Sequence, residues 1–174
     1  MANKKGKAAK KNSRTVPVLG AVLAVLAVVM IVALCLPRST TVDFTPPPFD
    51  QNAVSGVPEV PEELGYSAPY KEGMAYRFSV CGNVTVEGES AAVVYLTNPA
   101  ENDVWLKLRV LDGNDKVLGE TGIIKPGEYV RCVTLSSVPS EGTKIKLKIM
   151  GYEPETYLSA GSAALNTIMG GTLK

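Results

Sequence analysis

The C-terminal part of the chain is dominated by short segments in which apolar and polar residues alternate. The clearest is Lys-Ile-Lys-Leu-Lys-Ile-Met-Gly at residues 144–151, where Ile145, Leu147 and Ile149 alternate with three lysines. Side chains on a β-strand point alternately to the two faces of a sheet, whereas an α-helix would scatter these apolar residues around its circumference. The pattern therefore predicts a strand with one face packed on a core and a lysine-bearing face toward solvent.

The same alternation recurs from residue 75 onward, and turn-forming residues separate the runs. Within the run at 103–112 one face is wholly apolar, and the other carries Trp105, Lys107 and Arg109. Gly82, between the first two runs, is interpreted as a β-bulge. Short strands at this spacing without helices between them predict an antiparallel β-sandwich over residues 73–174. The expected strands are 75–80, 83–87, 91–97, 103–112, 117–120, 129–135, 143–152 and 162–169.

A different pattern occupies the N-terminal part of the chain. Residues 16–36 form a run of 21 residues without a charged or strongly polar side chain. As a helix this run is about 30 Å long, which matches the hydrocarbon thickness of a bilayer. Residues 1–15 carry six basic residues and no acidic one. The positive-inside rule then predicts a basic cytoplasmic tail, a transmembrane signal anchor, and an extracellular C-terminal domain.

Two alternatives to an uncleaved anchor stay open. A cleaved signal peptide would produce a secreted protein, but signal h-regions run to about 15 residues and no small-residue cleavage site follows this run. Lipidation of Cys35 is the second alternative, because Val-Ala-Leu-Cys approximates a bacterial lipobox, although Leu34 is larger than that motif requires. Binding of nucleic acid by the basic tail is not expected, since the tail has no aromatic or base-reading residues.

Residues 37–72 hold seven of the twelve prolines and several acidic residues. No helical or alternating pattern persists in this segment for more than a few residues. Proline removes a backbone donor and favours extended polyproline conformation. We therefore expect a Pro-rich extracellular linker that holds the domain away from the bilayer.

Composition excludes several kinds of chemistry. The chain has no histidine, which excludes Ser-His-Asp and Cys-His catalysis and removes the commonest zinc ligand. Cys81 and Cys132 fall in expected strands outside the membrane, where a disulfide between them would add about 4 kcal/mol. The alternative is that both pack as small apolar thiols. Asp112, Asn114 and Asp115 are ordinary turn residues, and we expect no calcium site among them.

Residues 94–135 carry a resemblance to a known class of domain. Val-Leu-Asp at 110–112, Val-Leu-Gly-Glu at 117–120 and Pro-Gly-Glu at 126–128 mark strand ends and turns. In this arrangement the segment resembles the middle of bacterial immunoglobulin-like or fibronectin-like surface domains. The overall layout is similar to small single-pass membrane proteins of Gram-positive bacteria. The resemblance implies an immunoglobulin-like sandwich and carries over no catalytic residue.

These observations lead to one functional expectation. We expect a non-catalytic binding or assembly module at the cell surface, without a cofactor or metal. Its partners would be the membrane together with another surface protein, a component of a secretion or transfer apparatus, or a cell-wall polymer. The alternative is an extracytoplasmic enzyme, but no clustered polar motif indicates one.

Overall fold

The computed structural model describes residues 25–28, 30, 44–67, 73 and 75–172. The chain divides into two units, Met1–Phe44 and Thr45–Lys174. Residues 25–28 and 30 are helical. The predicted tail at 1–15 and the rest of the predicted anchor at 16–36 lie outside the described residues. Within the described part of the chain, no helix combines the length and apolarity needed to cross a bilayer.

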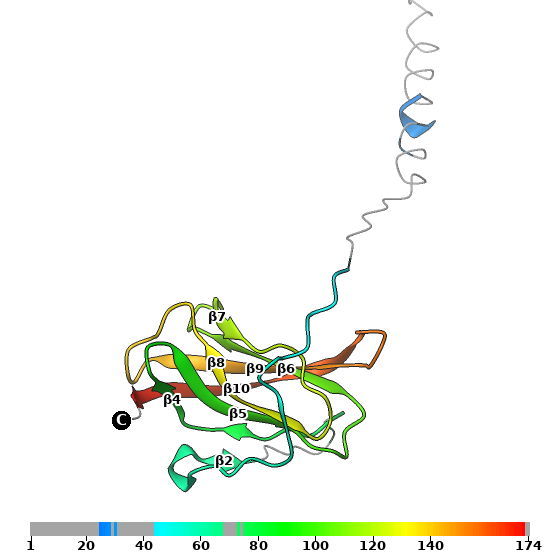
Figure 1. The fold of residues 1–174 in the computed structure, drawn as a ribbon. Helices are drawn as coiled ribbons and strands as arrows, with labels where there is room; N and C mark the ends of the chain where they lie inside the picture. Colours follow the sequence, from blue (N-terminus) through cyan, green and yellow to red (C-terminus); the bar gives the residue numbers. More distant parts are fainter. Residues whose placement is uncertain (1–24, 29, 31–43, 68–72, 74, 173–174) are drawn as a thin grey trace, which may run out of the picture. The chain divides into compact units, whose positions relative to one another are not determined.

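The second unit is an all-β domain, as the alternating pattern predicts (Figure 1). A two-stranded sheet and a 3-10 turn, η1 (Glu62–Leu64), accompany one large sheet of eight strands. The small sheet pairs β2 (Tyr66–Ser67) with β3 (Val80–Cys81). In spatial order the large sheet contains β1 (Val54–Ser55), β8 (Glu128–Thr134), β5 (Ala91–Asn98), β4 (Val84–Glu87), β10 (Ser159–Thr172), β9 (Lys144–Tyr152), β6 (Trp105–Leu111) and β7 (Val117–Glu120).

Strand β10 connects the two halves of this sheet. Its residues 159–168 pair antiparallel with β9, and Met169 and Thr172 pair parallel with β4. The parallel pair departs from the purely antiparallel arrangement that we expected. It arises because β10 has 14 residues and its partner β9 only 9, so that β10 extends beyond β9 to a second partner.

The large sheet curls, and its two halves enclose the core. Near the far ends of the sheet, the Leu118 carbonyl on β7 accepts hydrogen bonds from the backbone N–H of Ser136 at 2.7 Å and from its hydroxyl at 2.9 Å. Ser136 follows β8, so these bonds join β7 to the opposite half. Gly119 permits the approach, because a Cβ there would lie 2.4 Å from the Thr134 carbonyl oxygen.

The predicted apolar faces are confirmed. Ile145, Leu147 and Ile149 are at most 2% exposed, and they pack in the same cluster as the apolar residues of β6. The polar face of β6 differs from the prediction at Lys107, which is only 5% exposed. Its ammonium group lies 2.7 Å from the Glu120 carboxylate on β7, and this ion pair offsets the loss of solvation.

The run predicted at 75–80 is a strand only at its end. Ser79 pairs with Thr97, and Thr85 pairs with Val93, so six positions on one side match four on the other. The two extra residues fall around Gly82, where the sequence predicts a bulge. Regular pairing with β5 therefore stops at this irregularity, and β3 pairs with β2 instead.

Part of the linker predicted over residues 37–72 contacts the domain in the structure, from Pro48 to Ser67. Strand β1 pairs with β8, and Phe49 pairs with Ile123. The Asp50 carboxylate accepts a hydrogen bond from the Gly122 N–H at 2.7 Å. Leu64, in η1, is 2% exposed and packs in a small cluster with β3 and β5. Backbone pairing, one carboxylate and single apolar residues make these contacts, which is why no periodic pattern indicates them.

Candidate ligand-binding face

The outer face of β6, β9 and β10 carries most of the side chains with binding potential. Residues that pair across two strands share a face of the sheet. Lys146 pairs with Asn166, and Lys148 pairs with Arg109. The row of lysines on β9 therefore lies between a cation on β6 and an amide on β10. Alternate residues on a strand are about 7 Å apart, so the row presents ammonium groups at that spacing along β9.

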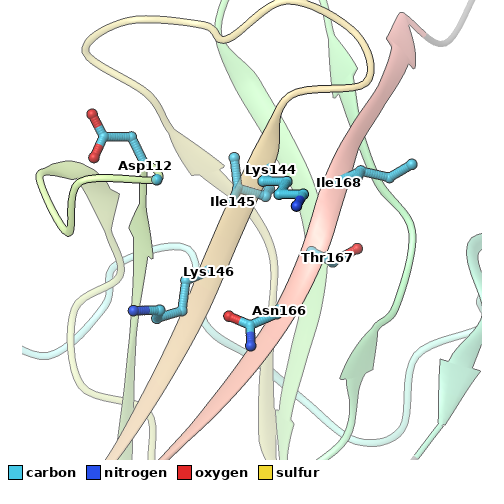
Figure 2. Close-up of a pocket in the computed structure, with 8 residues that line it drawn as sticks. Asp112, Lys144, Ile145, Lys146, Asn166, Thr167 and Ile168 are labelled. Carbon is cyan, nitrogen blue, oxygen red and sulfur yellow. The ribbon is translucent and has the colours of Figure 1, made fainter.

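A hollow of about 520 Å³ lies at one end of this row (Figure 2). Two neighbouring strands supply most of its lining, and the turn after β6 supplies the rest. Figure 2 shows Lys146 and Asn166 side by side on β9 and β10, with Lys144 next to Ile168. The lining residues are Asp112, Gly113, Lys144, Ile145, Lys146, Asn166, Thr167 and Ile168.

The cations of this face differ in how they are paired. Lys146 forms an ion pair with Asp115. The ammonium groups of Lys144 and Lys148 form no hydrogen bond or ion pair with any described residue. Unpaired ammonium groups beside a hollow raise the local concentration of anions and bind them through charge-assisted hydrogen bonds.

Glu120 holds two other cations of the face in place. Its carboxylate lies 2.7 Å from the Lys107 ammonium and 2.7 Å from Nε of Arg109. Burial by itself would raise the pKa of Glu120, but the hydrogen bonds from Lys107 and Arg109 outweigh it and lower that pKa. Glu120 therefore stays ionised, and it occupies these two cations rather than leaving them to a ligand.

Aromatic rings gather at the other end of the same face. Trp105, which we expected to point outward, lies on the outer face but is partly covered by two rings. Its ring centroid is 4.9 Å from that of Phe49 and 5.2 Å from that of Tyr157, both edge to face. The Lys125 ammonium lies 4.7 Å from the centre of the Phe49 ring. Tyr152 pairs with Trp105 across β9 and β6, so it belongs to the same end.

The other predicted site residues lie elsewhere. Cys81 and Cys132 are both free thiols, and both contact the small cluster around Val93 and Leu64. Burial raises the pKa of Cys81 to about 11 and also raises the pKa of Cys132, so neither thiol is reactive at neutral pH. In this structure no disulfide joins these two cysteines, and their packing corresponds to the second of the two alternatives, small apolar thiols.

The turn after β6 is held by its own hydrogen bonds. Asp112 Oδ1 accepts hydrogen bonds from the N–H groups of Asn114 and Lys116, as expected of an ordinary turn. In the part of the chain that the structure describes, no group of three His, Cys, Asp or Glu residues could hold a metal ion. The carboxylate of Asp112 therefore shapes the rim of the hollow.

Sequence reasoning identified the lysine row but not the hollow or the role of Asn166. Residues 162–169 give only a weak strand signal, because their side chains are mostly small and mixed in polarity. Only the pairing of β10 with β9 brings Asn166 beside Lys146. No protein-family model matches the chain, and no curated protein is significantly similar to it in sequence.

Proposed function

We propose that the protein is a membrane-anchored, non-catalytic binding module whose immunoglobulin-like sandwich lies outside the cell. The apolar run at 16–36 and the six basic residues before it support the anchor and its orientation. The all-β domain with two packed sheet halves supports the sandwich. In this reading the domain binds a partner at the cell surface, and the segment before residue 45 connects it to the bilayer.

The hollow at the lysine row carries the proposal, and its ligand is an anionic group. Lys144 supplies an ammonium group without an anionic partner among the described residues, directly at the lining. Asn166 adds an amide that can donate to and accept from the same ligand. Ile168, which is 54% exposed, supplies apolar surface beside these polar groups. A few polar groups that converge on a partly apolar hollow are typical of a ligand site.

An extracytoplasmic enzyme is less well supported by the same geometry. General acid–base catalysis requires a group held near a reacting atom and free to exchange a proton. The carboxylate of the lining residue Asp112 is engaged with backbone N–H groups, and Asp115 is engaged with the lining residue Lys146. Binding without chemical conversion therefore fits the arrangement best.

The test is a calorimetric titration of the full-length chain, in neutral detergent, with inorganic polyphosphate. We expect binding that weakens as salt is added, because ammonium–phosphate contacts are screened. Lys144→Glu should weaken binding at least tenfold. Arg131→Glu changes net charge equally but lies on β8, in the other half of the sheet, and should change affinity less than twofold. Equal effects of the two substitutions would show that only net charge matters and would refute the site.

A further inference from the structure

The lysine row and the aromatic end belong to one continuous face. Trp105, Lys107 and Arg109 alternate along β6, so they point to the same side. Tyr152 and Lys148 do the same along β9, and each pairs with a member of the β6 set. From Lys144 to Tyr152 the strand covers about 27 Å at its usual rise per residue. A ligand that extends along β9 would therefore meet the hollow first and aromatic rings last.

The aromatic end offers surface that the fold leaves uncovered. Phe49 is 39% exposed, and Trp105, Tyr152 and Tyr157 are partly exposed. The Trp105 ring packs edge to face against those of Phe49 and Tyr157, and the Lys125 ammonium lies over the Phe49 ring, so the cluster combines aromatic surface with a cation. Exposed apolar patches that are surrounded by polar residues often mark binding surfaces. This patch suits a ligand with flat apolar portions and polar edges.

Between the lysine row and the aromatic end, the β10 side of the face carries small side chains. Ser162 pairs with Met150, and Ala164 pairs with Lys148, and both small side chains are exposed. An extended polymer can lie across such residues without displacing a side chain. The unpaired charge along its path comes from Lys144 and Lys148, because Lys146 is paired with Asp115. These two lysines are about 13 Å apart along β9, which favours acidic groups that repeat along the ligand.

We propose that the ligand of this face is an acidic polysaccharide, whose carboxylates or other acidic groups bind the lysines while a sugar ring contacts Phe49 and Trp105. Pyranose rings combine an apolar C–H face with polar hydroxyl edges, which matches the aromatic end. Repeating acidic groups match the lysine row. This inference rests on the proposed function, because it names the ligand of the same anion-binding face.

Trp105 is the single tryptophan of the chain, so its fluorescence reports on the aromatic end alone. The experiment titrates the full-length chain in neutral detergent at fixed ionic strength with four probes. Oligogalacturonate has rings and charge, dextran oligomers have rings without charge, and polyphosphate has charge without sugar. Oligothymidylate tests a nucleic acid, which also combines rings and charge. We expect oligogalacturonate to shift the Trp105 emission, to protect it from acrylamide quenching, and to bind at least tenfold tighter than the others.

Two substitutions separate the ends of the face. Phe49→Ala should weaken oligogalacturonate at least fivefold and leave polyphosphate unchanged, whereas Lys144→Glu should weaken both. Val57→Ala is the matched control, because Val57 is 83% exposed and follows β1, which pairs with β8 in the other half of the sheet. Thermal melting of each variant shows whether it is folded. If Phe49→Ala does not fold, protection of Trp105 from acrylamide in the unaltered chain still tests whether the ligand reaches the aromatic end.

The outcomes distinguish the two proposals. If polyphosphate binds and responds to Lys144→Glu, but oligogalacturonate binds no tighter and Trp105 emission stays constant, the polysaccharide inference fails and the anion site stands. If no anionic probe binds, both proposals fail. Tighter binding of oligothymidylate than of oligogalacturonate would also overturn the inference, in favour of a nucleic-acid ligand.

Discussion

Gly151→Ala tests the packing that closes one end of the core. Gly151 lies inside β9, and a Cβ at this position would be 2.4 Å from Cε1 of the Tyr76 ring and 2.9 Å from two more of its atoms. Tyr76 is 5% exposed, so its ring has little room to move. Its hydroxyl donates hydrogen bonds to the carbonyls of Gly161 at 3.0 Å and Ile149 at 3.3 Å. Added volume at Gly151 therefore displaces both the ring and these bonds.

The expected loss follows from these contacts. Overpacking a core usually costs about 1–3 kcal/mol. Weakening of the hydroxyl hydrogen bonds adds about 1 kcal/mol, and better strand propensity of alanine returns about 0.5 kcal/mol. We expect Gly151→Ala to lower the free energy of unfolding by about 1.5–3.5 kcal/mol, measured by urea denaturation with an unchanged slope.

Two further variants test whether the loss comes from the contact between Gly151 and Tyr76. Gly113→Ala is the control, because a Cβ at Gly113 meets nothing within 4 Å and should change stability by less than about 0.5 kcal/mol. Tyr76→Leu removes the ring, and in that background Gly151→Ala should cost at least about 1 kcal/mol less. If Gly151→Ala melts like Gly113→Ala, or shows no coupling to Tyr76, the packing described for this end of the core is wrong.

Three other predictions concern charge, a buried thiol and the segment before residue 68. Burial would raise the pKa of Glu120, but hydrogen bonds from Lys107 and Arg109 outweigh it and lower that pKa. The ionised carboxylate therefore stabilises the fold at pH values above 4.5, the ordinary pKa of the group. Glu120→Gln should therefore lower the free energy of unfolding at pH 7, and urea titrations should show the difference shrinking as pH falls below 4.5. Burial raises the pKa of Cys81 from 9.0 to about 11, so stability should fall between pH 9 and pH 11, and Cys81→Ala should show a smaller fall over that range in thermal melts. Leu64→Ala should cost about 2–3 kcal/mol in urea denaturation, whereas Val57→Ala should stay within about 0.5 kcal/mol; equal values would show that η1 does not pack on the domain.

The sequence predicts which residues of the candidate site share a face within one strand. It does not predict which residues of neighbouring strands lie beside them. The alternation at 144–151 correctly placed Ile145 and Leu147 in the core and the lysines on the outer face. It could not show that Asn166 would lie beside Lys146, because strand pairing depends on register and not on either sequence alone. Lys107 shows the same limit, since its burial depends on a partner thirteen residues later.

The sequence alone determined where the strands from β4 to β9 lie and which face of each is apolar, because a period of two is a local property of the chain. It did not indicate β1 or β2, which form only by pairing with other segments of the domain. The tertiary structure alone decided where those faces meet. It placed Asp50 against Gly122, Tyr76 against Gly161, and Thr167 against Gly82, pairs separated by 72 to 85 positions. Such contacts arise when a curled sheet brings distant strands together, and their energy appears only after the chain has closed those long loops. The hollow at Lys144 and the aromatic end at Trp105 are consequences of that closure, so no local pattern could have revealed them.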